Sequence, residues 1–209
     1  IIDVKKTEIR YNSEWYKKGG LPKLLEISRA VTEQQLRERD DFQKRERSGD
    51  PISTLEILYP LLQGYDSVVV KADVEIGGTD QKFNMLMGRR VQRHFGMKEE
   101  DIITTPLIEG IDGVRKMSKS FDNYIGLSEN PTNMFAKTMK TPDALAGKYF
   151  EFLTDVDAPK KIDPYKSKML LAETIVGMYH SPAAAKKARE EFVRVFSKKE
   201  APEEGALPA

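Results

Sequence analysis

The strongest chemical pattern in this sequence is the five-residue string KMSKS at residues 116–120. It follows the turn-rich segment 109–113 and precedes Asn123. Lys116 and Lys119, three residues apart on a loop, can contact a polyphosphate and stabilise charge that develops on a departing pyrophosphate. A solvated basic loop is the simpler interpretation. However, a chance match to this string in a chain of this length has odds on the order of one in thousands, which favours the functional interpretation.

A second candidate is the glycine turn GGTDQ at residues 77–81. It comes at the end of an expected strand and opens an expected helix. Glycines there let a ligand approach the backbone closely, and Asp80 can accept hydrogen bonds from ribose hydroxyls. A plain strand-to-helix turn capped by Asp80 is the alternative. Taken alone, this alternative holds about two chances in three, because short glycine motifs often match by accident.

A third candidate is the set Tyr59, Gln63 and Asp66. Spacings of four and three residues place all three on one face of a helix. A Gln and an Asp beside a packed face need hydrogen-bond partners, and a small polar ligand could supply them. On spacing alone, side chains that simply face water remain about equally favoured.

The elements that must position these residues follow from apolar periodicity. We expect an irregular or strand-like opening over 1–25, a very polar helix over 33–47, an amphipathic helix over 54–69 and another over 83–95. We expect strands at 73–76 and 102–108. Helices that alternate with strands in this order predict an α/β unit with a parallel sheet and a right-handed crossover.

The pattern changes after Leu127, where we expect only helices. Four helix starts share one device, a capping side chain followed by proline: Asn130-Pro131, Thr141-Pro142, Asp163-Pro164 and Ser181-Pro182. We therefore predict a boundary near residue 127 between an α/β portion and a helical portion.

Composition excludes several classes of protein. The 209 residues include 34 Lys and Arg against 33 Asp and Glu, so the chain is neither an acidic tail nor a highly basic nucleic-acid wrapper. The absence of cysteine excludes disulfides, thiolate zinc sites and a cysteine nucleophile. No apolar run approaches the ~20 residues that span a bilayer, and no signal peptide is visible. We expect a cytoplasmic protein with neither a membrane nor DNA as its partner.

The three candidate strings together resemble one family. Residues 59–66 (YPLLQGYD), 74–84 (VEIGGTDQKFN) and the KMSKS loop with 123–126 (NYIG) are similar to motifs of bacterial tyrosyl-tRNA synthetases, which are class I aminoacyl-tRNA synthetases. The resemblance covers nearly the whole chain and is densest from Glu38 to Thr154. The KMSKS string marks class I synthetases generally. The Tyr-xxx-Gln-xx-Asp spacing with GGTDQ narrows the resemblance to the tyrosine enzyme.

This resemblance implies a role for each candidate residue. Tyr59 and Gln63 would hold the ammonium of substrate tyrosine, Asp66 would accept the hydrogen bond of its phenol, and Gln81 would lie near its carboxyl group. Lys116 and Lys119 would be catalytic, on the pyrophosphate. The implied ATP-binding set is Gly78, Asp80, Lys116, Met117, Ser118 and Lys119.

The implied reaction is formation of tyrosyl-adenylate from ATP and tyrosine, followed by transfer to tRNA(Tyr). Positioning and electrostatics would supply the catalysis, without a covalent nucleophile on the protein. ATP would be a substrate and would bring Mg²⁺ with it, so we expect no dedicated protein metal site.

The resemblance also implies a domain plan. The fold class would be α/β, the second half of a Rossmann-like nucleotide-binding fold with parallel strands, followed by an all-helical domain. We expect a connecting insertion over 1–50, the nucleotide-binding half with the KMSKS loop over 51–127, a helical domain over 128–199 and a linker over 200–209 to a missing RNA-binding domain. The family is dimeric, and Leu36 and Phe42 on the polar helix 33–47 would need cover, which predicts a homodimer contact there.

One departure from the family pattern concerns histidine. Class I enzymes place a His-Ile-Gly-His-type string on the nucleotide phosphates, and neither His94 nor His180 has such a context. We therefore expect this chain to be an incomplete piece of the enzyme that is inactive alone.

Two alternatives remain. One is tryptophanyl-tRNA synthetase, although Gln63 stands where that enzyme usually has Met and its nucleotide string resembles Gly-x-Asp-Gln. The other is a non-catalytic RNA-binding or assembly module derived from a synthetase.

Overall fold

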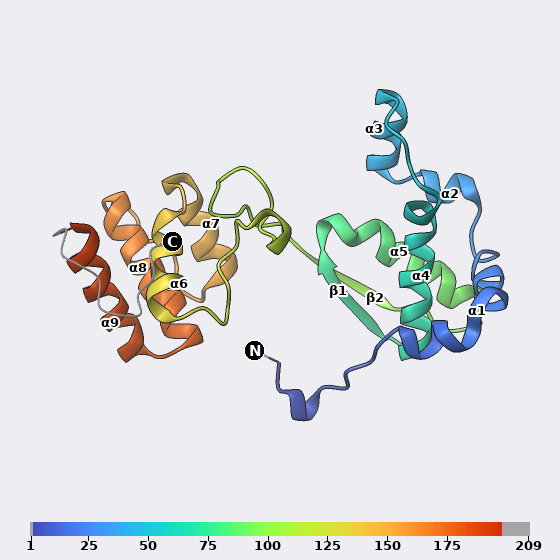
Figure 1. The fold of residues 1–209 in the computed structure, drawn as a ribbon, viewed down its shortest axis with the longest axis horizontal. Coiled ribbons are helices and arrows are strands. Elements are labelled where there is room, and N and C mark those ends of the chain that lie inside the picture. The colour runs from blue at the N-terminus through green and yellow to red at the C-terminus, as the bar shows by residue number, and fades with distance from the viewer. Residues whose placement is uncertain (1, 198–209) are drawn as a thin grey trace. The chain divides into compact units, whose positions relative to one another are not determined.

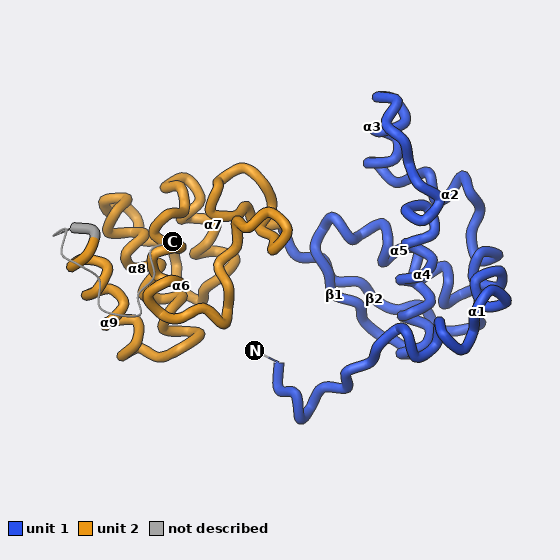
Figure 2. The backbone as a smooth tube through the Cα atoms, viewed as in Figure 1, with its two compact units in different colours: residues 1–106 blue, residues 107–209 orange. Residues whose placement is uncertain are grey.

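A computed structural model describes residues 2–197 of the chain, which divide into two compact units. Figure 2 shows the first unit, up to Pro106, and the second, from Leu107 onward. Each is described by itself. The division lies before the expected boundary near residue 127, so the KMSKS loop belongs to the second unit. The expected linker, residues 200–209, lies outside the described residues.

The first unit combines helices with a two-stranded parallel sheet (Figure 1). Its elements are a 3₁₀ turn Val4–Lys6, α1 (Ser13–Ile27), α2 (Glu33–Arg37), α3 (Asp40–Ser48), α4 (Thr54–Val70), β1 (Val74–Gly78), a 3₁₀ turn Thr79–Gln81, α5 (Lys82–His94) and β2 (Asp101–Thr105). Val74 lies opposite Asp101 and Gly78 opposite Thr105. The predicted parallel strand pair, with α5 between its strands, is therefore confirmed.

Local capping explains where α4 begins. Ser53 accepts a hydrogen bond from the Glu56 N–H at 3.2 Å, and the Glu56 carboxylate accepts one from the Ser53 N–H at 2.9 Å. This reciprocal pair satisfies two backbone donors at the helix start. The apolar period of the sequence then continues for 17 residues, and Lys71 ends the helix in the left-handed conformation.

Three expectations about the first unit need correction. The opening segment is helical over Ser13–Ile27 rather than irregular, with a break at Gly20, whose φ is 53°. The expected single helix over 33–47 is two helices, because Arg39 is extended between them with ψ of 123°. The expected strand 102–108 ends at Thr105.

The core of the first unit also corrects the argument for a dimer contact at the polar helix. Leu36 is 5% exposed and packs with Ile27 and Leu61 in the core that lies between α1, α2 and α4. Phe42 is 1% exposed, and the Arg39 guanidinium lies 4.9 Å from its ring centroid. Both side chains are covered within the chain, so neither requires a second subunit.

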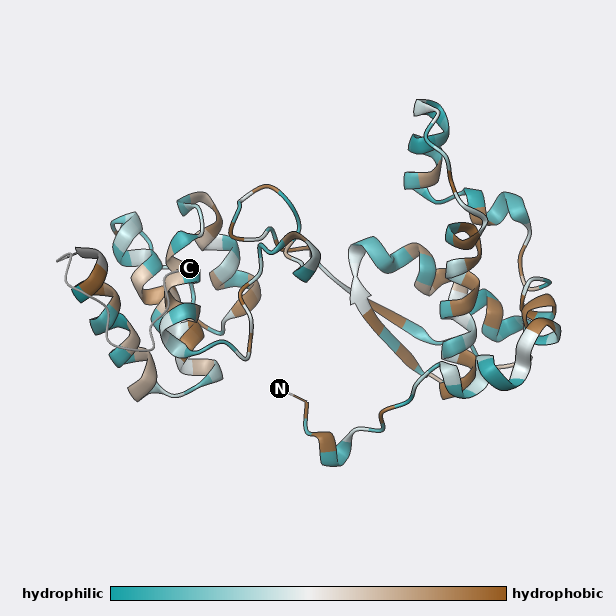
Figure 3. Ribbon diagram, viewed as in Figure 1, coloured by the Kyte–Doolittle hydropathy of each residue, from teal (hydrophilic) through white to brown (hydrophobic). Residues whose placement is uncertain are grey.

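The sheet carries apolar side chains that are open to solvent within the first unit. Figure 3 shows hydrophobic residues along both strands. Val74 is 48% exposed, Ile76 is 69% exposed and Ile103 is 50% exposed. An exposed apolar sheet face is typical of a surface that another element covers.

The described part of the second unit is helical apart from one isolated backbone bridge in its opening loop. Its elements are a 3₁₀ turn Lys119–Phe121, α6 (Pro131–Lys140), α7 (Asp143–Leu153), α8 (Pro164–Tyr179), α9 (Pro182–Phe192) and a π turn Val193–Ser197. Asn130, Asp163 and Ser181 cap their helices as predicted, each with proline next. The fourth start was predicted wrongly, because Pro142 itself is the N-cap and α7 begins at Asp143.

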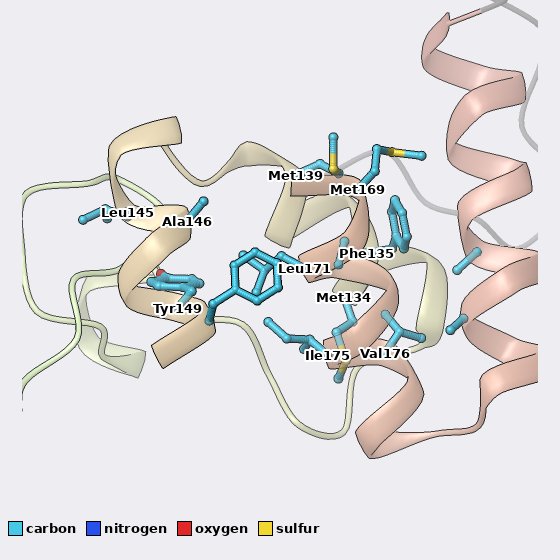
Figure 4. Packing of buried hydrophobic residues seen from close by; sticks show 14 residues of the cluster. Met134, Phe135, Met139, Leu145, Ala146, Tyr149, Met169, Leu171, Ile175 and Val176 are labelled. Atoms are coloured by element: carbon cyan, nitrogen blue, oxygen red, sulfur yellow. The ribbon is translucent and has the colours of Figure 1, made fainter. Parts of the chain in front are cut away.

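Figure 4 shows the core that holds α6–α9 together. Met134, Phe135, Tyr149, Leu171 and Val176 are completely buried there. The Tyr149 hydroxyl lies at the edge of this core and donates a 2.7 Å hydrogen bond to the backbone carbonyl of Glu109, in the loop that precedes the KMSKS string. The helical core therefore supports that loop. None of the helices in the described part of the chain has the length and apolar character needed to traverse a bilayer.

Candidate active site

A polar network in the first unit joins two of the sequence-predicted residues, Gln63 on α4 and Gln81 before α5. Asn84, which is 4% exposed, donates to Gln63 Oε1 at 3.1 Å and to Gln81 Oε1 at 3.2 Å. Gln63 Nε2 donates in turn to Glu75 Oε1 at 2.8 Å. These contacts hold the two glutamines in defined orientations, with Gln63 Oε1 as an acceptor.

A pair of glutamates behind this network was missed by the sequence analysis. Glu75 on β1 is half-buried, and Glu100, just before β2, is 1% exposed. A Cβ added at Gly88 would lie 2.6 Å from Glu100 Oε1 and 3.6 Å from Glu75 Oε2, so the two carboxyl groups converge on this glycine. Burial, then the Glu75 carboxylate, raises the pKa of Glu100 to about 7. The alternation of polar and apolar residues around Glu75 was the available signal.

Glycines allow α4 and α5 to approach each other beside this pair. A Cβ at Gly64 would lie 2.9 Å from the Gly88 Cα, which is closer than packed atoms come. The backbones of the two helices therefore touch at Gly64 and Gly88. The absence of a side chain at Gly88 also leaves room for Glu100 Oε1.

Asp66 lies where α1 meets α4. Its Oδ1 accepts a 2.9 Å hydrogen bond from Trp15 Nε1, and its Oδ2 is 3.5 Å from Asn12 Nδ2. An ionised carboxylate has about four acceptor positions, so these contacts orient Asp66 and leave it able to accept another donor. The adjacent Tyr16 donates to the Leu62 carbonyl at 2.7 Å, and burial raises the pKa of this phenol.

The other predicted residues of the first unit are more open. Tyr59 lies one turn before Gln63 on α4 and is 56% exposed. Gly78 ends β1 and precedes the 3₁₀ turn that contains Asp80, whose side chain is exposed. This turn connects the carboxyl end of a parallel strand to a helix, which is where open α/β sheets bind ligands.

The KMSKS loop of the second unit is held by backbone pairing. The Met117 N–H donates to the Ile108 carbonyl at 2.7 Å, and the Gly110 N–H donates to the Arg115 carbonyl at 2.8 Å. Glu109 and Lys116 form an antiparallel bridge between these bonds. Lys116 and Lys119 are exposed. Met117 is half-buried and packs against the helical core.

The side chain of Asn123 hydrogen-bonds to the backbone of this loop. It is 2% exposed, and its Oδ1 accepts from the Ser118 N–H at 2.8 Å. Its Nδ2 lies 3.0 Å from Asp112 Oδ2, 3.2 Å from the Arg115 carbonyl and 3.1 Å from the Lys116 carbonyl. Gly110 makes room for it, since a Cβ there would lie 2.3 Å from Asn123 Cγ. The sequence pointed to Asn123 as a residue that flanks the loop and opens the NYIG string, but assigned it no role.

Asp112 completes the support of the loop. The Val114 N–H, then the Asn123 and Arg115 side chains, lower the pKa of Asp112 to about 2. It is therefore an anion at neutral pH and orients both Asn123 and Arg115.

The described residues contain no group of three or more His, Cys, Asp or Glu side chains arranged to hold a metal ion. The predicted residues divide between the units: Tyr59, Gln63, Asp66, Gly78, Asp80 and Gln81 lie in the first, and Lys116, Met117, Ser118 and Lys119 in the second.

Comparison with known proteins gives one consistent family. The model of the family tRNA synthetases class I (W and Y) matches residues 1–197. A tyrosine–tRNA ligase from Wolinella succinogenes is 47% identical over 98% of this chain and 53% of its own length. One from Aquifex aeolicus is 47% identical over 99% of this chain and 54% of its own. The chain thus spans about half the length of the curated relatives it matches.

Solved structures show the same fold at lower identity. A mitochondrial tyrosyl-tRNA synthetase from Aspergillus nidulans matches with a TM-score of 0.64 and 22% identity, over 88% of this chain and 57% of that one. The tyrosyl-tRNA synthetase of Archaeoglobus fulgidus, solved with L-tyrosine, matches with a TM-score of 0.63 and 21% identity, over 88% of this chain and 67% of that one.

Proposed function

Because this chain belongs to the class I tRNA synthetase family of the tryptophan and tyrosine enzymes, we propose that the whole protein is a tyrosine–tRNA ligase. Relatives that are 47% identical over nearly the entire chain carry that name, which favours tyrosine over tryptophan. The two parallel strands and α5 then belong to the second half of a Rossmann-like nucleotide-binding fold. Their exposed apolar side chains support a place for them within a larger sheet.

The observation that carries this proposal is the network that joins Gln63 to Gln81 through Asn84. An amino acid carries an ammonium donor and a carboxylate acceptor on the same α-carbon. Gln63 Oε1 accepts hydrogen bonds and suits the ammonium, together with Tyr59 one turn earlier. Gln81 lies beside the reacting carboxyl group in this assignment.

Asp66 supplies the specificity for tyrosine in this proposal. Trp15 and Asn12 hold its carboxylate, and a further acceptor position receives the phenol O–H of the substrate. Phenylalanine has no phenol O–H and would leave that further acceptor position unfilled once the substrate covers it, and a site built to hydrogen-bond a hydroxyl rejects such an analogue strongly.

Gly78 and Asp80 lie against the adenosine ribose of ATP. The substrate carboxylate attacks the α-phosphorus, the bond to the bridging oxygen breaks, and pyrophosphate leaves with the electron pair. Lys116 and Lys119 stabilise the charge on that leaving group, with the backbone of Met117 and Ser118 holding the loop that carries them. Mg²⁺ enters with ATP on its phosphates.

A hydroxyl of the terminal adenosine of tRNA(Tyr) then attacks the carbonyl carbon of the adenylate, and AMP leaves. We propose that the whole protein works as a homodimer. The exposed Leu21, Leu25 and Leu55 of the first unit are apolar surface that a second copy would cover.

Tyrosine-dependent exchange of pyrophosphate into ATP by the whole protein tests the assignment. Tyrosine should support exchange, and phenylalanine and tryptophan should support it at least a hundredfold less well. Equal rates with tyrosine and phenylalanine, or a preference for tryptophan, would contradict the proposal.

A further inference from the structure

The amide of Gln63 has a defined orientation that needs an explanation. An amide side chain can place either its oxygen or its nitrogen at a given point, and its partners decide which. Gln63 Nε2 donates to Glu75 at 2.8 Å, and its Oε1 accepts from Asn84 at 3.1 Å. Only with this orientation does Gln63 offer an acceptor. Glu75 Oε1 therefore has to be an acceptor, and the Ser67 hydroxyl lies 3.5 Å from the other Glu75 oxygen.

Glu100 lies close enough to Glu75 that the charge of one carboxyl group depends on the charge of the other. Glu100 is 1% exposed, and both carboxyl groups converge on Gly88. Two anions in contact in a water-poor space repel strongly, so one of the two must hold a proton. Glu100 Oε1 is buried and has no hydrogen-bond partner among the described residues, whereas Glu100 Oε2 lies 3.4 Å from Gln92 Nε2. A proton on Oε1 can be donated toward the Glu75 carboxylate.

We propose that Glu100 holds this proton and donates it in a hydrogen bond to Glu75, and that Glu75 thereby positions the Gln63 amide with its oxygen toward the ammonium of the substrate. The inference rests on the proposed function. Glu75 and Glu100 are positioning residues, because they act through Gln63. The proton shared by Glu75 and Glu100 thus fixes the orientation in which Gln63 Oε1 can accept from the amino acid.

The other groups that face the pair are few. Helix α5 supplies Arg89, whose guanidinium is 3.1 Å from Glu99, and Gln92, whose Nε2 is 3.4 Å from Glu100 Oε2. Helix α4 supplies the Ser67 hydroxyl. Burial and Glu75 raise the pKa of Glu100, so its proton is lost only when the pH rises to about neutral or above. Loss of the proton would leave two carboxylates in contact and release Glu75 from Gln63.

The test measures tyrosine-dependent pyrophosphate exchange by the whole protein with the variants Glu75→Leu, Glu100→Leu and Glu100→Gln. Both leucine variants should raise KM for tyrosine by about tenfold, the loss of roughly one positioned hydrogen bond, while kcat and KM for ATP change less than threefold. Glu100→Gln keeps a donor toward Glu75, so its KM for tyrosine at pH 6 should stay within about twofold of the unsubstituted protein. Glu38→Gln, an exposed glutamate at the end of α2, is the matched control and should change nothing.

The pH profile separates positioning from mere support of the fold. Between pH 6 and 8.5 the unsubstituted protein should lose affinity for tyrosine at least fivefold more than Glu100→Gln does, because only the former can lose the shared proton. A pair that only stabilises the fold would lower the melting temperature of the leucine variants and leave KM for tyrosine and both pH profiles unchanged. That result would overturn the inference.

A second readout does not depend on activity. Carboxyl ¹³C NMR of the glutamate-labelled protein, with Glu100→Gln for assignment, should show Glu100 titrating well above the other glutamates. Titration in the ordinary range would also overturn the inference. Absence of tyrosine exchange in the unsubstituted protein would instead contradict the proposed function and the role of Gln63, while the NMR titration would still report whether the proton is shared.

Discussion

The two regions that carry the candidate residues are organised in opposite ways. In the first unit, the side chains of Gln63, Asn84 and Gln81 bond to one another on regular elements, and Glu100 is buried behind them. In the second unit, Lys116 and Lys119 are exposed, and order resides in the backbone of the loop that carries them. The first region holds its candidate side chains in place through side-chain hydrogen bonds. The second holds only the backbone of the loop in place.

This difference matches the two tasks that the proposed function would require. A small amino acid has the same shape and charge each time it binds, so its site gains from acceptors that are already oriented. The negative charge on a leaving pyrophosphate develops only during the reaction, and long flexible side chains on a fixed loop can follow it. The predictions below test whether the two regions divide the work in this way.

The largest effect is expected at the loop. Lys116→Ala and Lys119→Ala should each raise the barrier to adenylate formation by roughly 2–4 kcal/mol, since each lysine meets charge that is greatest in the transition state. Affinity for tyrosine should barely change. Single-turnover kinetics and equilibrium tyrosine binding on the whole protein measure the two quantities. If both variants activate tyrosine normally, the loop is only a solvated basic segment.

A smaller effect concerns the stability of the first unit against pH. The folded state raises the pKa of Glu100 above its ordinary value of 4.5 to about 7, so the folded protein binds this proton more tightly than the unfolded one. The unfolding free energy should therefore fall as the pH rises from about 4.5 through 7, by up to about 3 kcal/mol. Glu100→Gln should lack this contribution. Fluorescence of Trp15, the one tryptophan, reports on the unfolding of the first unit. Identical slopes in both proteins would contradict the assignment of the proton.

Selectivity should respond to Asp66. Asp66→Ala removes a charged acceptor worth about 1.5–3 kcal/mol, so the ratio of kcat/KM for tyrosine to that for phenylalanine should fall by roughly 10–100-fold. Asp73→Ala, at an exposed position before β1, is the control. An unchanged ratio in Asp66→Ala would assign that carboxylate to the contact between α1 and α4 alone.

The two units also differ in how much room they leave around a helical glycine. Gly88→Ala would place a Cβ 2.6 Å from Glu100 Oε1 and should destabilise the first unit by about 1–3 kcal/mol. Gly147→Ala on α7 meets nothing within 4 Å and should be neutral or stabilising by up to about 1 kcal/mol. Chemical denaturation measures both. Equal behaviour would mean that the α4–α5 contact is loose enough to absorb a methyl group.

The smallest effect is expected from loosening the loop rather than removing its charges. Asn123→Ala frees the backbone of Arg115, Lys116 and Ser118 and should lower kcat for activation about tenfold through misplacement of the lysines. Asn133→Ala on α6 is matched in type, since only its backbone N–H takes part in the helix cap. If Asn123→Ala activates tyrosine at the normal rate, the backbone pairing of the loop is sufficient by itself.

The elements with a strong local signal could be predicted from the sequence. Capping residues and apolar period gave α4 and α5, and the glycine turn marked the end of β1. Helix α1 was missed because Gly19, Gly20 and Pro22 are locally unfavourable to helix, whereas contacts of Trp15 and Tyr16 with α4 stabilise it. Contacts between distant segments also cover Leu36, which a local pattern cannot reveal.

Part of the candidate site could likewise be predicted from the sequence, and part could not. The residue types and spacings of Gln63, Asp66 and the KMSKS loop were visible in the sequence, because helix geometry and a short string place them. The link from Gln63 to Glu75 and Glu100 joins α4, β1 and the start of β2, so it exists only after the chain folds. Asn123 was visible as a residue, but its burial and its four backbone and side-chain partners were not.

The hydrogen bonds from Asn123 to the loop backbone also determine at which stage the loop loses conformational entropy. Fixing the backbone of one residue costs roughly 1–2 kcal/mol of entropy, and a loop that became ordered only around its ligand would lose that amount for each residue on binding. Here the backbone on both sides of the Gly113 turn is already paired or held by the Asn123 amide. The cost is therefore borne when the chain folds. A polyphosphate that reaches this loop therefore meets a backbone that is already ordered.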